Sequence, residues 1–178
     1  MKIAITGHTA GIGKALAQAY HKHEIIGLSK RDGNNIRNIP KIADLIEPAD
    51  VFINNAQAGY AQTELLFEMC KRWSGSVDKH IVVISTMMTQ WPVSTIPELA
   101  EYRIQKISLE QAVQQLRYIH WNPRITIVRP GDIATSPEKT MPPSADVDVW
   151  ARSLVQILEL ADANGLDIPE ISLGAARI

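Results

Sequence analysis

Two residues four positions apart, Tyr102 and Lys106, could together move a proton. The stretch around them has helical spacing, so their side chains would lie one turn apart on the same face of a helix. An ammonium group favours the phenolate, and we therefore expect Lys106 to lower the pKa of Tyr102 from its usual value of about 10 toward neutral pH. A phenol with such a pKa can act as a general acid or base. The same spacing also fits an exposed pair on a surface helix.

A second candidate site is the glycine-rich run Thr6-Gly7-His8-Thr9-Ala10-Gly11-Ile12-Gly13, which follows an apolar stretch. Glycine is required where φ is positive, where a side chain would block a ligand, or where a helix packs closely on a strand. A helix that starts at this turn would present free N–H groups and a partial positive charge, which suit a phosphate. A tight turn without a ligand would use the same residues.

Strand-like and helical segments alternate along the chain, and they have to position these two sites. Strands are expected at 1–5, 25–29, 50–54, 80–85, 124–128 and 168–173, and helices at 14–20, 39–46, 61–73, 97 to about 119 and 147–160. This alternation predicts an α/β fold: a Rossmann-type doubly wound parallel sheet with helices on both faces. Ligands of such sheets bind at the carboxyl ends of the strands, where the glycine-rich run would lie.

The composition fits a single domain over residues 1–178 and excludes several classes of partner. The 18 Lys and Arg against 19 Asp and Glu give a net charge of -1, which argues against nucleic acid or a polybasic membrane anchor. Cys70 is the only cysteine, and His21 and His23 lack nearby ligand partners, so no metal site is predicted. With no bilayer-length apolar run and no signal-peptide pattern, we expect a cytoplasmic protein without a membrane partner. Whether it forms a homo-oligomer stays open.

Five motifs follow one another at the strand ends. They are Thr-Gly-x-x-x-Gly-x-Gly at 6–13, Asn-Asn-Ala at 54–56, Ser-Thr at 85–86, Tyr-x-x-x-Lys at 102–106 and Pro-Gly-x-Ile-x-Thr at 130–135. In this order the chain resembles the short-chain dehydrogenase/reductase family over nearly its whole length, as an unusually short member. The resemblance implies an NAD(P)-dependent oxidoreductase that interconverts a carbonyl and a secondary alcohol of a small molecule by hydride transfer.

The resemblance also implies catalytic roles. In the family, the tyrosine protonates the carbonyl oxygen during reduction and takes the alcohol proton during oxidation, which is the role implied for Tyr102. Lys106 would hold the nicotinamide ribose. Thr86 matches the serine that hydrogen-bonds the substrate oxygen, and Ser85 is the alternative if the register differs by one residue.

The family's cofactor contacts carry over to the matched motifs. The glycine loop would hold the pyrophosphate, the Asn-Asn-Ala turn would lie against the adenosine ribose and the nicotinamide side, and the Pro-Gly turn would hold the carboxamide. The residues concerned are Gly7, Gly11, Ile12, Gly13, Asn54, Ala56, Pro130, Gly131, Ile133 and Thr135. For the two asparagines, capping of a strand end is the alternative.

The end of the second strand predicts which dinucleotide binds. An acidic residue there would bind the ribose 2′-hydroxyl of NAD, whereas an arginine favours the 2′-phosphate of NADP. The sequence has Ser29, Lys30 and Arg31, with no carboxylate before Asp32. We therefore predict NADP as the preferred cofactor and NAD as the alternative. Asn35 would replace the family's adenine-binding aspartate.

Departures from the family pattern leave other functions open. The shortening is expected after Ala56, and the asparagine that completes a proton relay to the lysine is absent there, with Gln62 as a substitute. A non-catalytic dinucleotide sensor would fit that loss. A nucleotide-sugar reductase or epimerase would fit Thr86, although little chain remains to bind the sugar nucleotide. Trp91 could line the substrate pocket or pack in the core, and 136–143 is expected to be a loop over the substrate.

Overall fold

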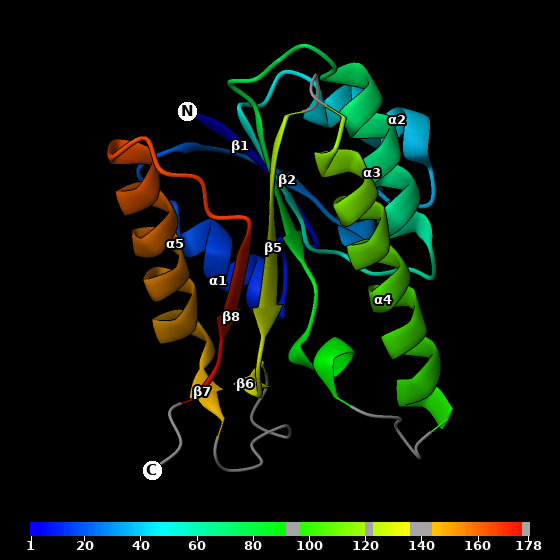
Figure 1. Cartoon of the computed structure of the whole chain (residues 1–178), viewed down its shortest axis with the longest axis vertical. Coiled ribbons are helices and arrows are strands. Elements are labelled where there is room, and N and C mark those ends of the chain that lie inside the picture. Colours follow the sequence, from blue (N-terminus) through cyan, green and yellow to red (C-terminus); the bar gives the residue numbers. More distant parts are fainter. Residues whose placement is uncertain (92–96, 120–122, 136–143, 176–178) are drawn as a thin grey trace.

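Six parallel strands form the central sheet, which lies between two layers of helices (Figure 1). The structure is a computed structural model that describes residues 1–91, 97–119, 123–135 and 144–175, so the expected loop at 136–143 lies outside the described residues. The strands of the sheet are β1 (Lys2–Thr6), β2 (Glu24–Leu28), β3 (Val51–Asn54), β4 (His80–Ile84), β5 (Arg124–Pro130) and β8 (Glu170–Leu173). A separate pair consists of β6 (Ile133–Ala134) and β7 (Ala145–Asp146).

Helices cover both faces of the sheet, which confirms the predicted doubly wound fold. One face is covered by α1 (Gly11–Ala19) and α5 (Val147–Ala163), and the other by α2 (Ile39–Ile46), α3 (Ala61–Arg72) and α4 (Pro97–Arg117). Two short 3-10 helices, η1 (Lys30–Asp32) and η2 (Met87–Gln90), follow β2 and β4. Within the described ranges, none of the helices is both long and apolar enough to cross a bilayer.

Alternate residues of each strand enter two separate cores. In β1, Ile3 and Ile5 pack with the core under α1 and α5, whereas Ala4 between them packs with the core under α2, α3 and α4. Because both faces are covered, every residue of β4 is buried, and its sequence is a nearly continuous apolar run. Burial of each such large side chain contributes about 1.5–3 kcal/mol, so burial fixes the position of the sheet between its helices.

The strand order β2-β1-β3-β4-β5-β8 places the site at the carboxyl ends of β1 and β3. This is the flavodoxin-like order of doubly wound sheets, in which the winding reverses between these two strands and opens a crevice. In the dinucleotide-binding order, a further strand lies beyond the second one. Here β2 is an edge strand. Relative to the family pattern, part of the shortening of the chain therefore lies between β2 and β3, and not only after Ala56 as we expected.

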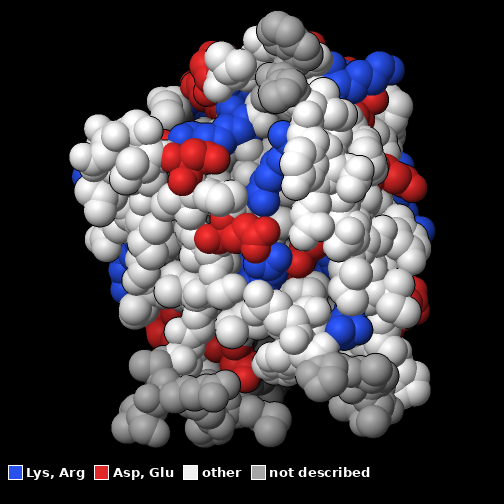
Figure 2. Space-filling model, viewed as in Figure 1, with Lys and Arg blue, Asp and Glu red and all other residues white. Residues whose placement is uncertain are grey.

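The opposite edge strand, β8, is tied to its neighbours by ion pairs. Glu170 lies 2.7 Å from Nη1 of Arg129 in β5 and 3.4 Å from Nη1 of Arg117 in α4, and Arg124 pairs with Asp162 of α5 at 2.6 Å. Figure 2 shows basic and acidic side chains side by side along the middle of this face. The Glu170 pairs connect β8 to β5 and to α4, and the Arg124–Asp162 pair connects β5 to α5. The two half-exposed pairs, Arg117–Glu170 and Arg124–Asp162, contribute about 0–1 kcal/mol each, whereas the Arg129 side chain is buried.

Candidate active site

The glycine loop joins β1 to α1 at the crevice. Gly7 and Gly11 have φ values of 75° and 50°, a region that other residues rarely adopt. Gly13 is needed for a different reason, because a Cβ there would lie 2.3 Å from the carbonyl oxygen of Gly7. Ala10, the N-cap residue of α1, has no side-chain oxygen to cap the helix. The first N–H groups of α1 therefore stay available to an anion.

Thr6 fixes the other side of the crevice. Its Oγ1 accepts hydrogen bonds from the backbone N–H groups of Asn55 and Ala56, at 3.0 Å each. Asn55 returns a bond from Nδ2 to the carbonyl oxygen of Thr6 at 2.9 Å. These bonds hold the turn after β3 against the glycine loop. For Asn55, the bond from Nδ2 supports the alternative of strand-end capping. No role was predicted for the Thr6 hydroxyl, although a hydroxyl at the end of a strand beside a glycine run is a signal for this kind of link.

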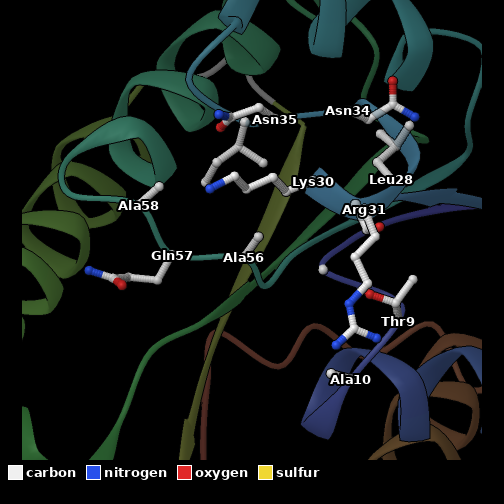
Figure 3. A pocket seen from close by; sticks show the side chains of 13 residues that line it. Thr9, Ala10, Leu28, Lys30, Arg31, Asn34, Asn35, Ala56, Gln57 and Ala58 are labelled. Carbon is white, nitrogen blue, oxygen red and sulfur yellow. The ribbon is translucent and has the colours of Figure 1, made fainter.

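A first cavity of about 550 Å³ lies on the β2 side of the glycine loop. Six of the residues predicted to bind the cofactor line it: Gly7, Ser29, Lys30, Arg31, Asn35 and Ala56. Figure 3 shows the Lys30 and Arg31 side chains diverging within this cavity, with Arg31 directed toward Thr9 and the start of α1. The cavity thus offers two cationic groups to an anion.

The carboxylate nearest to the end of β2 is held by neighbouring side chains. Ser29 donates from Oγ to Oδ2 of Asp32 at 2.7 Å, and Nε2 of His8 lies 3.8 Å from the same oxygen. The His8 ring occupies the space that a Cβ of Gly27 would need, so the ring is seated on the strand itself. Ser29 lines the first cavity, while its hydroxyl donates a hydrogen bond to Asp32.

A second cavity, of about 430 Å³, contains the three residues predicted to be catalytic. Its lining includes Thr86, Tyr102 and Lys106 together with Ile12, Pro130, Gly131, Ile133 and Thr135 from the predicted cofactor site. Gln57 lines both cavities, so the two adjoin at the turn after β3. The topology thus brings together residues from five separate segments of the chain.

Tyr102 and Thr86 are hydrogen-bonded to each other in this second cavity. Burial raises the pKa of Tyr102, and the hydrogen bond with Thr86 opposes part of that rise. Our expectation that Lys106 lowers the pKa of Tyr102 is therefore wrong for this structure. The spacing predicted the proximity of the two side chains correctly, since Nζ of Lys106 lies 5.6 Å from the centre of the tyrosine ring. It could not predict the burial of both groups.

Lys106 is enclosed by oxygen atoms from two other elements. Its side chain is deeply buried, and Nζ donates to Oε1 of Gln62 and to the carbonyl oxygen of Ile84, at 2.8 Å each. Burial lowers the pKa of Lys106 from its usual 10.5 to about 7, and the nearby Glu110 carboxylate opposes this shift. The amine therefore exchanges a proton near neutral pH. Gln62, a substitute for the absent asparagine in the sequence analysis, contacts the lysine directly.

Ser85 and Thr86 have different surroundings. Ser85 donates from Oγ to Oε1 of Glu110, which also accepts a bond from Oγ1 of Thr89 at 2.9 Å. Glu110 is paired with Arg129, whose Nη2 lies 2.7 Å from Oε2. The hydroxyl of Ser85 is thus engaged in a buried network, whereas that of Thr86 contacts Tyr102. Of the two alternatives, this geometry favours Thr86.

Three predicted cofactor residues line neither of these cavities. Asn54 is fully buried, and its Nδ2 donates to the carbonyl oxygen of Gln62 at 2.9 Å. The structure therefore replaces the expected cofactor contact of Asn54 with a structural contact to α3, and the next residue, Asn55, lines the second cavity instead. Gly13 packs against the loop, and Gly11 adjoins Thr135.

The remaining wall of the second cavity comes from residues outside the matched motifs. Met87, Met88, Trp91 and Asp132 contribute to it, so the structure supports the cavity-lining alternative for Trp91. Arg103 holds this wall in place: Nε donates to the carbonyl oxygen of Met88 at 2.9 Å and Nη2 to that of Trp91 at 2.6 Å. Neither Arg103 nor Asp132 belongs to a periodic pattern that could have identified its role.

Comparison with known proteins identifies the fold. No protein-family model matches the chain, and no curated protein matches it by sequence. An alcohol dehydrogenase from the archaeon Thermococcus sibiricus, in complex with 5-hydroxy-NADP, matches with a TM-score of 0.76 at 15% identity, over 99% of this chain and 98% of that one. Serine dehydrogenase from Escherichia coli matches with a TM-score of 0.73 at 16% identity, over 98% and 97%. A short-chain dehydrogenase from Burkholderia cenocepacia in complex with NADP gives 0.69 at 18% identity, over 98% and 88%. Over nearly its whole length, the chain has the fold of the short-chain dehydrogenases/reductases.

Proposed function

We propose that this protein is an NADP(H)-preferring oxidoreductase that interconverts a carbonyl group and a secondary alcohol. The main support is that Tyr102, Thr86 and Lys106 line one cavity together with Ile133 and Thr135. Proteins of the same fold have been solved in complex with NADP or with 5-hydroxy-NADP, which supports the choice of cofactor.

The residues around the crevice fit a phosphorylated dinucleotide. Gly7 and the uncapped start of α1 suit the pyrophosphate, since backbone N–H groups at a helix N-terminus bind anions. Lys30 and Arg31 suit the 2′-phosphate of NADP. When bound, NADPH supplies the hydride that reduces the carbonyl carbon and leaves as NADP⁺.

The side chains of the second cavity handle the proton and the oxygen of the substrate. The hydroxyls of Thr86 and Tyr102 both donate to the carbonyl oxygen, and Tyr102 transfers its phenolic proton to that oxygen during reduction. In the reverse direction, the phenolate takes the proton of the alcohol. Since burial raises the pKa of Tyr102, the phenol is protonated at neutral pH, as carbonyl reduction requires. Protonated Lys106 donates two of its N–H groups within the protein and keeps one for the cofactor ribose.

The test compares the wild type with Tyr102→Phe, in which only the hydroxyl is removed. NADPH oxidation is followed with a panel of aldehydes, ketones and nucleotide sugars, and NADPH binding is measured by calorimetry. We expect the variant to bind NADPH as the wild type does and to lose about 10²–10⁴-fold in turnover. Retained turnover in Tyr102→Phe would remove this residue from the mechanism. NADPH binding by a wild type that turns over no substrate would favour the sensor, and turnover of nucleotide sugars only would favour the reductase or epimerase.

A further inference from the structure

We infer that Glu110 is a positioning residue, which fixes the place of the Thr86 hydroxyl beside Tyr102. This inference rests on the proposed function, in which Thr86 and Tyr102 both donate to the substrate oxygen. Glu110 belongs to none of the matched motifs and lines neither of the two cavities. It acts from α4 on the chain before and after Thr86.

One carboxylate oxygen of Glu110 accepts hydrogen bonds from both sides of Thr86 in the chain. Ser85, which directly follows β4, donates from Oγ to Oε1. Thr89, in η2, donates from Oγ1 to the same oxygen at 2.9 Å. The Thr89 hydroxyl also lies 2.8 Å from the carbonyl oxygen of Thr86, between Glu110 and the turn. The turn that carries Thr86 is therefore attached to α4 on both sides.

The position of η2 determines where the Thr86 hydroxyl lies. Thr86 is the N-cap residue of η2, and its Oγ1 accepts a bond from the backbone N–H of Met88 at 3.3 Å. The same hydroxyl is hydrogen-bonded to Tyr102. A shift of η2 would therefore move the Thr86 hydroxyl relative to Tyr102. Because Glu110 holds η2 at Thr89, it opposes such a shift.

Arg129 of β5 holds the Glu110 carboxylate in place. Its Nε lies 3.1 and 3.0 Å from the two carboxylate oxygens, and its Nη2 lies 2.7 Å from Oε2. Nη1 of Arg129 binds Glu170 of β8 at 2.7 Å. Glu110 and Arg129 are only 7% and 5% exposed, and a buried charge is costly without its partner. The pair thus connects the turn that carries Thr86 to the neighbouring strands of the sheet.

The donors around Glu110 explain why a carboxylate is needed there. Within the described part of the chain, four donor groups converge on it: the hydroxyls of Ser85 and Thr89, and Nε and Nη2 of Arg129. A carboxylate has two oxygens with about four acceptor positions and no donor. The amide of a glutamine would turn its N–H groups toward either the hydroxyls or the guanidinium. It could not accept from all four donors.

The test asks whether Glu110 acts on Tyr102 through Thr86. Glu110→Gln keeps the shape of the side chain and removes its charge, and Thr89→Val removes the hydroxyl that joins Glu110 to the turn. Each change is made in the wild type and in Thr86→Val, which lacks the hydroxyl that Glu110 positions. The matched controls are Glu64→Gln, at an exposed position of α3, and Thr89→Ser, which keeps the hydroxyl.

The first readout is the ¹³C NMR signal of Tyr102 Cζ at neutral pH, in tyrosine-labelled protein without ligand, assigned by its loss in Tyr102→Phe. This signal responds to hydrogen bonding at the phenolic oxygen. We expect Glu110→Gln and Thr89→Val each to move it toward its position in Thr86→Val, and neither to move it further in Thr86→Val. An unmoved signal in either variant, or equal movement in both backgrounds, would overturn the inference. If Glu110→Gln fails to fold, Thr89→Val decides alone.

The second readout is kcat for carbonyl reduction at saturating NADPH. It uses Thr89→Val alone, because the charge of Glu110 also acts on Lys106. In the wild type, Thr89→Val should lower kcat about three- to tenfold, the equivalent of one hydrogen bond. In Thr86→Val, the same change should leave kcat nearly unchanged, because the hydroxyl that it displaces is already absent. Losses that multiply would indicate a purely structural role and overturn the inference.

The two readouts separate this inference from the proposed function. A wild type that reduces no carbonyl compound would overturn the proposed function. The Tyr102 signal of the protein without ligand would still decide whether Glu110 positions Thr86.

Discussion

Replacement of Lys106 by methionine should change how the stability of the protein depends on pH. Methionine keeps the unbranched stem of the side chain and removes the nitrogen that titrates. In the folded wild type, burial lowers the pKa of Lys106 to about 7, against 10.5 for a solvated lysine. The unfolded chain therefore binds more protons between these two values. The free energy of unfolding of the wild type should consequently rise with pH in this window, and Lys106→Met should lack that rise.

The expected size of the effect follows from the two pKa values. Between pH 6 and pH 9, proton linkage gives the wild type a gain of about 2.7 kcal/mol relative to the variant, most of it above pH 7. The variant also leaves Gln62 and the Ile84 carbonyl without the donor that Lys106 supplies. That loss lowers the stability of the variant by a nearly constant amount, so it offsets the two curves without changing the difference in their slopes.

The assay is urea-induced unfolding of both proteins, followed by circular dichroism at a series of pH values across this window. His80, whose pKa is lowered to about 4 by burial, and Cys70, whose pKa is raised to about 12 by burial, are common to both proteins. Their contributions cancel in the difference. Parallel stability curves for the wild type and Lys106→Met would refute the reasoning, because Lys106 would then titrate alike in the folded and unfolded chains.

Three further substitutions test the crevice. Arg31→Asp should raise the Kd for NADP about tenfold or more, equivalent to about 1.4 kcal/mol, and leave the Kd for NAD nearly unchanged, because it reverses a charge that lines the first cavity. Calorimetry with both cofactors measures this, and equal losses would contradict the placement of the 2′-phosphate. Ser29→Ala removes the donor that holds Asp32, so the affinity for NAD relative to NADP should rise; an unchanged ratio would show that the carboxylate stays away from the ribose. Gly13→Ala should cost about 1–3 kcal/mol of stability and weaken NADPH binding, because the new Cβ would lie 2.3 Å from the Gly7 carbonyl oxygen. An unchanged melting temperature would contradict this contact.

The order and type of the major elements were predictable because each is marked by a local pattern. All residues of β4 are buried, so its apolar run is nearly continuous, and Pro40 near the start of α2 marks a helix N-terminus. Strand order is not a local property. Whether β2 lies at the edge of the sheet depends on which strand the next crossover connection reaches. Hydrophobic periodicity within a segment does not indicate this. The two-residue strands β6 and β7 are too short to show a period at all.

Residues at strand ends were the most predictable part of the site. The carboxyl ends of parallel strands meet at one edge of the sheet, so Thr86 and the Pro130–Thr135 turn had to lie near each other once the topology was known. The pKa of Tyr102 was not predictable by the same route. Helical spacing predicts the distance between Tyr102 and Lys106, but the direction of the shift depends on how deeply the rest of the chain buries both groups.

The residues that support the site act between elements, which is why local patterns did not predict their contacts, and Gln62 was named only as a substitute for the asparagine that the family resemblance implies. Gln62 reaches Lys106 from α3, and Glu110 reaches Ser85 from α4. Arg103 of α4 donates to the carbonyl oxygen of Trp91 at the end of η2, which lies twelve positions earlier in the chain. Gln62 and Glu110 each accept a hydrogen bond from a buried polar group, and an unsatisfied group of that kind costs about 1–3 kcal/mol. Different sequences can meet the same need with different side chains at different positions. The contacts that these supporting side chains make therefore become visible only in the three-dimensional structure.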